Sequence, residues 1–204
     1  MAIRFGVSST VKNRLPRYSN FWDGTAVYSP FSPTGSYDAL ATYTVGSGGL
    51  STITFSGIPN TYAHLQIRGI ARTAGTNERI NLTFNSDTAS NYSMHRLVGN
   101  GSAASASAQS SQSALWVSSG YDGVSNTANT FTAYVLDVLD YTSTSKTKTL
   151  RALDGLDKNG SGGIEFSSGG WFKTPEAINT ISMSIQGGAS FAQYSQFALY
   201  GVKG

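Results

Sequence analysis

The chain has 204 residues, a formal net charge of +3, no cysteine, and charged side chains at only 12% of its positions. This length suits one domain with a sizeable core, and the lack of cysteine excludes disulfides and thiolate chemistry. A composition so rich in small polar residues is typical of many strands joined by turns, and no apolar run reaches the roughly 18 residues that a membrane helix needs.

The positive charge is concentrated at the start of the chain. Residues 1–17 contain four basic residues and no acidic one, which leaves ten basic and eleven acidic residues in the remainder. A nucleic-acid-binding domain would carry its basic residues on the folded surface. We therefore expect no direct nucleic-acid contact and no membrane partner. The four basic residues are Arg4, Lys12, Arg14 and Arg17.

Residues 1–35 differ in character from the rest. They hold three of the five prolines, which remove backbone donors and interrupt ladders, and they show little periodicity. Disordered segments are usually poor in aromatic residues, whereas this one is rich in them. We predict an extended N-terminal arm that lies on a partner surface. Its aromatic residues are Tyr18, Phe21, Trp22, Tyr28 and Phe31.

Apolar and polar residues alternate with period two over the rest of the chain. Leu65 and Ile67, for example, fall on one face of their segment, while Gln66 and Arg68 fall on the other. This period is typical of strands that have one buried and one hydrated face. Turns rich in glycine and asparagine separate the segments, and no segment has the 3.6-residue period of a helix.

The pattern predicts an all-β domain over residues 36–204. Many short strands joined by polar turns indicate a two-sheet antiparallel sandwich, jelly-roll-like in type. The expected strands are 37–45, 50–56, 61–73, 79–84, 92–98, 113–118, 130–140, 147–153, 163–168, 181–186 and 195–202.

The segment 101–113, GSAASASAQSSQS, has low complexity. Its small polar side chains cannot pack a core, so we predict an exposed loop there.

The stretch 156–166, LDKNGSGGIEF, resembles a calcium loop, with Asp157, Asn159 and Ser161 at the first, third and fifth positions of an EF-hand pattern. Such a loop needs a glutamate at its twelfth position, where Ser168 stands, and helices on both sides, where the flanks are strand-like. Asn-Gly between strands is a strong hairpin signal. We predict a hairpin and no cofactor, with weak calcium binding at 157–165 as the alternative.

Catalytic and metal-binding patterns are weak. The histidines, His64 and His95, and the eleven scattered carboxylates do not show the spacing of a metal site or of a glycosidase pair. We expect Asp137 and Asp140 to face opposite sides of one strand. The sequence therefore predicts no enzyme.

Aromatic residues on a sandwich surface can bind sugars, and four residues are candidates for such a platform. For Trp116 and Trp171 the competing interpretation, which we favour, is a core or subunit-contact role. The four candidates are Tyr62, Trp116, Tyr121 and Trp171.

Five segments of the body are distinctive as a set: SGIPNTYAHLQIRGIART, NYSMHRLVGNGSAAS, ANTFTAYVLDVLDYTSTSKTKTLRALDGLDKNGSG, GGWFKTPEAINTISM and FALYGVKG. Through them, residues 36–203 resemble a sandwich domain of virion structural proteins of tailed bacteriophages. The resemblance implies an adhesive or structural module and transfers no catalytic residue. It does not extend to residues 1–35.

These observations together predict a capsid decoration, or cement, protein on the exterior of the virion. The arm would bind the major capsid protein, and the body would form a homotrimer with other copies of itself. The alternative is a tail or fibre component whose sandwich loops recognise a glycan on the host surface.

Overall fold

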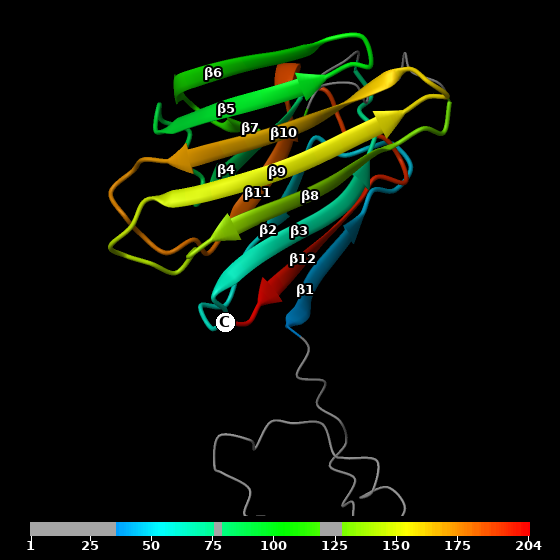
Figure 1. Cartoon of the computed structure of the whole chain (residues 1–204). Helices are drawn as coiled ribbons and strands as arrows, with labels where there is room; N and C mark the ends of the chain where they lie inside the picture. The colour runs from blue at the N-terminus through cyan, green and yellow to red at the C-terminus, as the bar shows by residue number, and fades with distance from the viewer. Residues whose placement is uncertain (1–35, 76–78, 119–127) are drawn as a thin grey trace, which may run out of the picture. The chain divides into compact units, whose positions relative to one another are not determined.

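The computed structural model describes residues 36–75, 79–118 and 128–204. Within these ranges the chain forms twelve strands in two antiparallel sheets and a short 3-10 helix, η2 (Gln186–Gly188) (Figure 1). The predicted all-β, two-sheet sandwich is therefore confirmed, and the predicted arm lies outside the described residues. No helix in the described part of the chain has the length and hydrophobicity needed to span a bilayer.

Eight strands form the larger sheet, with each strand antiparallel to its neighbours. Strands β1 and β6 are therefore its two edges. In spatial order the strands are β1 (Tyr37–Thr44), β12 (Gln196–Val202), β3 (His64–Ala71), β8 (Thr132–Leu139), β9 (Lys148–Asp157), β10 (Gly162–Trp171), β5 (Tyr92–Gly99) and β6 (Ala104–Gln112).

Four short strands form the smaller sheet, in the order β2 (Thr52–Phe55), β11 (Ile181–Ile185), β4 (Ile80–Phe84) and β7 (Leu115–Trp116). This sheet packs on one face of the larger sheet, which we call the inner face (Figure 1). The opposite face, which we call the outer face, is not covered by a second layer in the described part of the chain.

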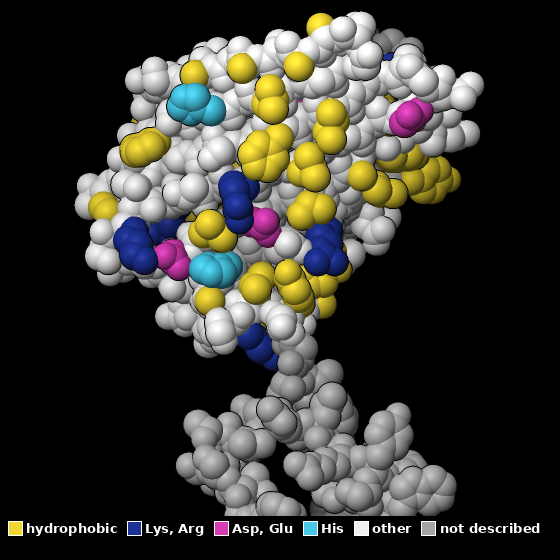
Figure 2. Space-filling view, in the orientation of Figure 1, with side chains coloured by type: hydrophobic (Ala, Val, Ile, Leu, Met, Phe, Trp, Pro, Cys, Tyr) yellow, Lys and Arg dark blue, Asp and Glu magenta, His cyan; other side chains and the backbone are white. Residues whose placement is uncertain are grey.

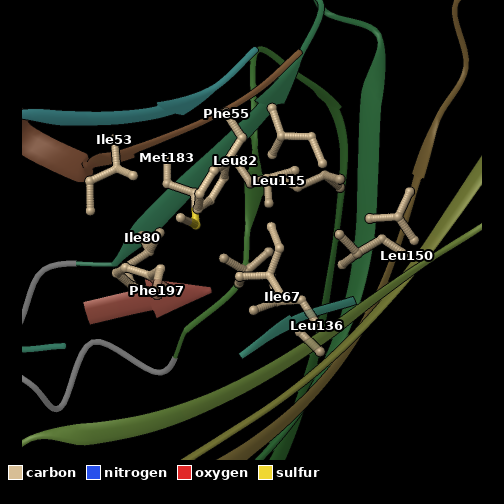
Figure 3. Close-up of a cluster of buried hydrophobic side chains, with 14 of the residues drawn as sticks. Ile53, Phe55, Ile67, Ile80, Leu82, Leu115, Leu136, Leu150, Met183 and Phe197 are labelled. Carbon is tan, nitrogen blue, oxygen red and sulfur yellow. The ribbon is translucent and has the colours of Figure 1, made fainter. Parts of the chain in front are cut away.

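The alternation of apolar residues builds the core between the sheets. Ile67 and Leu136 point inward from the larger sheet and meet Leu82 and Met183 from the smaller one, and all four are buried (Figure 3). Full burial of such a side chain contributes roughly 1.5–3 kcal/mol. The core is therefore large enough to hold the sandwich together.

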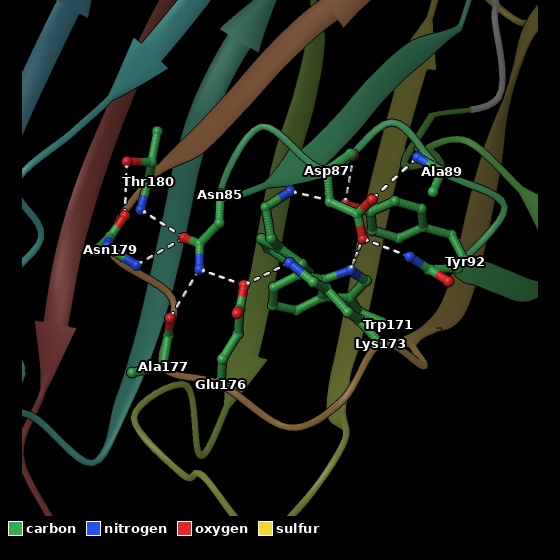
Figure 4. Close-up of polar contacts among 12 residues, drawn as sticks. Asn85, Asp87, Ala89, Tyr92, Trp171, Lys173, Glu176, Ala177, Asn179 and Thr180 are labelled. Carbon is green, nitrogen blue, oxygen red and sulfur yellow. Dashed lines mark hydrogen bonds and ion pairs between the residues drawn. The ribbon is translucent and has the colours of Figure 1, made fainter.

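A polar network closes one end of this core (Figure 4). The Asp87 carboxylate accepts hydrogen bonds from Trp171 Nε1 at 2.6 Å and from Asn91 Nδ2 at 2.8 Å, while Asn85 Nδ2 donates to Glu176 at 3.1 Å. Burial acts to raise the pKa of Asp87, but these hydrogen bonds outweigh it and hold the pKa below its ordinary value. The network fastens the β4–β5 turn to the segment that follows β10.

The loop predicted over 101–113 is wrong for most of its length, because Ala104–Gln112 forms the edge strand β6. Its pairing with β5 runs from Ala104 opposite Gly99 to Gln112 opposite Tyr92. Alanine and serine differ too little in hydrophobicity to show an alternation, so backbone hydrogen bonds alone define this strand. Its side chains are mostly exposed, as expected.

The predicted hairpin at Asn159-Gly160 is confirmed. These residues have φ angles of 61° and 91°, as a type I′ turn requires, and the Lys158 amide donates to the Ser161 carbonyl at 2.6 Å. The Asp157 carboxylate accepts a hydrogen bond from the Gly160 amide at 3.1 Å. The carboxylate expected at the first position of a calcium loop therefore helps to close the turn.

Candidate binding surface on the outer face

The site residues predicted from the sequence lie outside the described residues. They are Arg4, Lys12, Arg14, Arg17, Tyr18, Phe21, Trp22, Tyr28 and Phe31. Their role in partner binding stays a prediction, and the described body carries a candidate surface of its own.

A row of large apolar side chains crosses the outer face. Leu97 on β5 is opposite Phe166 on β10, which is opposite Leu153 on β9, which is opposite Val135 on β8. Their exposed fractions are 55%, 49%, 45% and 39%. Directly opposite residues have Cβ atoms about 4.5–5.5 Å apart. The four side chains therefore form one continuous row.

Two more exposed side chains extend this row. Ile164 lies two residues before Phe166 and is 53% exposed, and Ile70 on β3 is opposite Ala133 and is 44% exposed. Residues two apart on a strand share a face, so both point outward. We call the six residues the apolar stripe: Ile70, Leu97, Val135, Leu153, Ile164 and Phe166.

The stripe gathers most of the large hydrophobic side chains that are exposed in the described residues. It holds six of the ten large hydrophobic side chains that are exposed in the described part of the chain, and Figure 2 shows hydrophobic side chains gathered over the middle of this face. The stripe spans five strands, each about 4.8 Å wide, and two rows of side chains, each about 6.6 Å long, so its area is roughly 300 Å². Patches of this size often mark interaction sites.

The β9–β10 hairpin sets the register that creates the stripe. Its two-residue turn places Asp157 opposite Gly162 and, four residues further along each strand, Leu153 opposite Phe166. A slip of one residue would turn Phe166 toward the core. The turn sequence therefore decides which side chains reach the outer face.

Polar residues border the stripe on the β3 side. Gln66 Nε2 donates to Asp137 at 2.7 Å, and Arg68 Nε donates to Gln66 at 2.5 Å. The Arg68 guanidinium also lies 5.2 Å from the ring centre of Tyr37 and 5.6 Å from that of Tyr200. These contacts hold the arginine in place, so it can bind a partner at a low cost in side-chain entropy.

Two open hollows flank the stripe. One, of about 550 Å³, lies beside Ile164 and is lined by the glycines Gly99, Gly155 and Gly163 and by the β9–β10 turn. The other, of about 410 Å³, lies beside Ile70 and includes Arg68 and Ala198. The outer face thus carries projecting side chains in its middle and space at both ends.

The carboxylates singled out from the sequence have structural partners. The expectation that Asp137 and Asp140 face opposite sides of one strand is wrong, because β8 ends at Leu139 and Asp140 lies beyond it. Asp140 pairs with Lys146 at 2.7 Å and lies 3.6 Å from His64 Nδ1. The Lys146 ammonium, through its hydrogen bond and charge, holds the pKa of Asp140 below its ordinary value.

A buried polar group lies on the inner face. Glu165 and Asp154 are opposite one another on β10 and β9, and they are 0% and 2% exposed. Glu165 accepts two hydrogen bonds from Arg96, one of them from Nε at 2.7 Å. Buried carboxylates of this kind are not accessible to a glycan. Among the described residues there is also no cluster of three or more histidines and acids placed to hold a metal ion.

Three of the four aromatic residues that were candidates for a glycan platform pack against the core. Trp171 is 2% exposed and stacks with Tyr92 at 6.3 Å between ring centres, which confirms its core role. Trp116 packs partly buried against the core, with Arg79 5.1 Å from its ring, and Tyr62 also packs against the core. The fourth residue, Tyr121, lies outside the described residues.

Sequence reasoning missed the stripe, although a signal was present. In VLDVL and LRALDGL, apolar residues occupy both phases of the alternation, so some of them must point away from the core. Comparison with models of known protein families, with curated proteins and with solved structures gave no match. The function is therefore inferred from the residues and the geometry of the outer face.

Proposed function

We propose that the protein is a structural component of a phage virion, a decoration protein that binds the outer capsid surface and stabilises the shell. The observation in the described body that supports a role in assembly is the apolar stripe. A folded body that exposes a continuous apolar row with an ordered polar border is suited to contact with another protein surface. The resemblance of residues 36–203 to phage sandwich domains supports the virion context.

In this proposal residues 1–35 attach the body to neighbouring major capsid subunits. Aromatic anchors such as Phe21 and Trp22 would bury about 150–250 Å² each, and the basic residues would orient the segment on an acidic shell. Each attached copy adds buried area across a boundary between capsomers. The shell then resists the outward pressure of packaged DNA better. The homotrimer expected from the sequence stays a prediction.

Deletion of residues 1–35 tests the attachment. The body has its own core, so the truncated protein should remain folded by circular dichroism but no longer sediment with purified shells. Binding equal to that of the full chain would contradict the proposal.

Point substitutions in the same segment give a finer test. Phe21→Ala and Trp22→Ala should each weaken shell binding by about 2 kcal/mol or more, because buried aromatic anchors dominate interface energies. Lys12→Ala, the matched control, should cost about 1 kcal/mol or less, since exposed charge pairs contribute little.

A tail or fibre component that recognises a glycan is the second candidate. The observation that favours it is the 550 Å³ hollow formed by turns at one end of the sandwich. Copy number separates the two functions: quantitative mass spectrometry of purified particles should find hundreds of copies of a decoration protein. A few copies to a few dozen would instead favour the tail.

A further inference from the structure

We propose that the outer face is the surface through which copies of this chain pack on one another, with the apolar stripe buried against the same face of a second copy. This goes beyond shell attachment, because it makes self-association a property of the body alone and needs no capsid.

The relief of the face suits a second copy. Projecting and small residues alternate across the strands. Ile164 on β10 lies between Gly99 on β5 and Gly155 on β9, and Gly155 is in turn opposite Ala133 on β8. A surface that packs on itself must offer a hollow for each projection it carries. The two hollows beside Ile164 and Ile70 supply that space.

The area is large enough for a stable contact. Eight strands about 4.8 Å apart and about eight residues long, at about 3.3 Å per residue, give a face of roughly 1,000 Å². A standard interface buries about 800 Å² on each partner. Two such sheets can stack face to face about 10 Å apart, as the sheets of a sandwich do.

The charge of the face also favours a copy of itself. On β3, β5, β8, β9 and β10, the charged residues of the outward phase are Arg68, Arg151, Asp137 and Asp157. Two positive and two negative charges in these described strands cancel. A face with an excess of one sign would repel its own copy and favour a partner of the opposite sign.

The test uses the full chain in solution. Sedimentation equilibrium over a series of concentrations should give a mass of twice 21.5 kDa for the parent protein, because a face that packs on the same face of another copy closes as a dimer. The double variant Leu97→Asp/Phe166→Asp should have the mass of one subunit, with an association weakened at least about 30-fold.

A matched control keeps the test specific. Tyr43→Asp/Tyr194→Asp replaces two exposed aromatic residues, 40% and 66% exposed, that lie outside the stripe, and it should associate like the parent. Circular dichroism of both variants checks that they are folded.

A second measurement does not depend on whether the fold tolerates the two introduced aspartates. The chain has no cysteine, so Leu153→Cys introduces a single thiol in the stripe, and Tyr194→Cys places one outside it. A short bis-maleimide reagent should cross-link the first variant between subunits far faster than the second.

Three results would overturn the inference. One is a parent protein that is monomeric at all concentrations. Another is an oligomer that the double aspartate variant leaves intact. The third is a parent mass of three times 21.5 kDa, which does not fit a face packed on the same face of one other copy. A monomeric parent whose shell or glycan binding is lost in the double variant would assign the face to that other partner. Shell binding is scored in a separate assay, so failure here leaves the proposed attachment through residues 1–35 standing.

Discussion

The two faces of the eight-stranded sheet carry similar side chains in opposite surroundings. On β8, Leu136 is 1% exposed and its neighbour Val135 is 39% exposed; on β9, Leu150 is 1% exposed and Leu153 is 45% exposed. The four-stranded sheet covers only the inner face, so the outer residues have no covering layer in the described chain. Apolar residues in both phases of a strand thus show that the core accounts for only one of its two faces.

The largest effect is expected where a charge is buried on the inner face. Arg96→Ala leaves the Glu165 carboxylate enclosed without its guanidinium, which should lower the free energy of unfolding by about 3–5 kcal/mol. Arg151→Ala, an arginine on the outer face, should change it by about 0.5 kcal/mol or less. Urea denaturation measures both, and equal losses would show that the two faces do not differ as described.

A pair of adjacent residues gives the sharpest comparison of the faces. Leu136→Ala should cost about 2–5 kcal/mol because it opens a cavity in the core. Val135→Ala should cost about 0.5 kcal/mol or less in the monomeric Leu97→Asp/Phe166→Asp background, where association does not contribute. A large loss from Val135→Ala in that background would mean that the outer face is needed for the fold itself.

The network at the end of the core should respond to pH. Asp87→Ala leaves Trp171 Nε1 and Asn91 without their acceptor and should cost about 1–3 kcal/mol at neutral pH. The folded-state pKa of Asp87 is lowered, so its stabilisation is present above the unfolded value near 3.9 and is lost as the pH falls through the folded pKa. The stability difference between parent and variant should therefore shrink below about pH 4.

Tyr92 gives the opposite pH dependence in the same network. Burial raises the pKa of Tyr92 to about 12, so the stabilisation of the neutral phenol is present below about pH 10 and is lost as the pH rises toward the folded value. Tyr92→Phe should reduce the loss of stability at alkaline pH that is expected of the parent. A decline of the same size in both proteins would rule out this residue as its source.

A smaller effect than the loss of a core contact is expected at the turn that sets the register. Gly160 has a φ of 91° with open space around its Cα, so Gly160→Ala should cost about 1 kcal/mol through backbone strain alone. Hydrogen exchange of the β9 and β10 amides should accelerate locally. Unchanged exchange there would show that the turn does not control the pairing that places Phe166 outward.

The strands with strong contrast between their two faces were predictable from the sequence. Ile181, Met183 and Ile185 on β11 alternate with polar residues, and the short-range Asn159-Gly160 signal located its hairpin. The edge strand β6 was not predictable, because alanine and serine give no contrast.

The ends of two strands were also missed. Strands β9 and β10 continue past the expected 147–153 and 163–168. A charge such as Asp154 indicates exposure in a sequence, and only the fold brings the buried Glu165 and Arg96 near it. The outward apolar residues of β8 and β9 left a signal in the sequence, but their meeting with residues of three other strands could not be predicted, since it depends on the register of five strands.

Hydroxyl-radical footprinting of purified virions tests most directly whether the outer face is covered in the working assembly. Oxidation of Phe166 and Leu153 should be slowed at least about tenfold relative to the dilute free protein, while Tyr194, which is 66% exposed outside the stripe, provides the internal reference. Oxidation of Phe166 and Leu153 at the same rate in virions as in the dilute protein would contradict the assignment of this face as a binding surface.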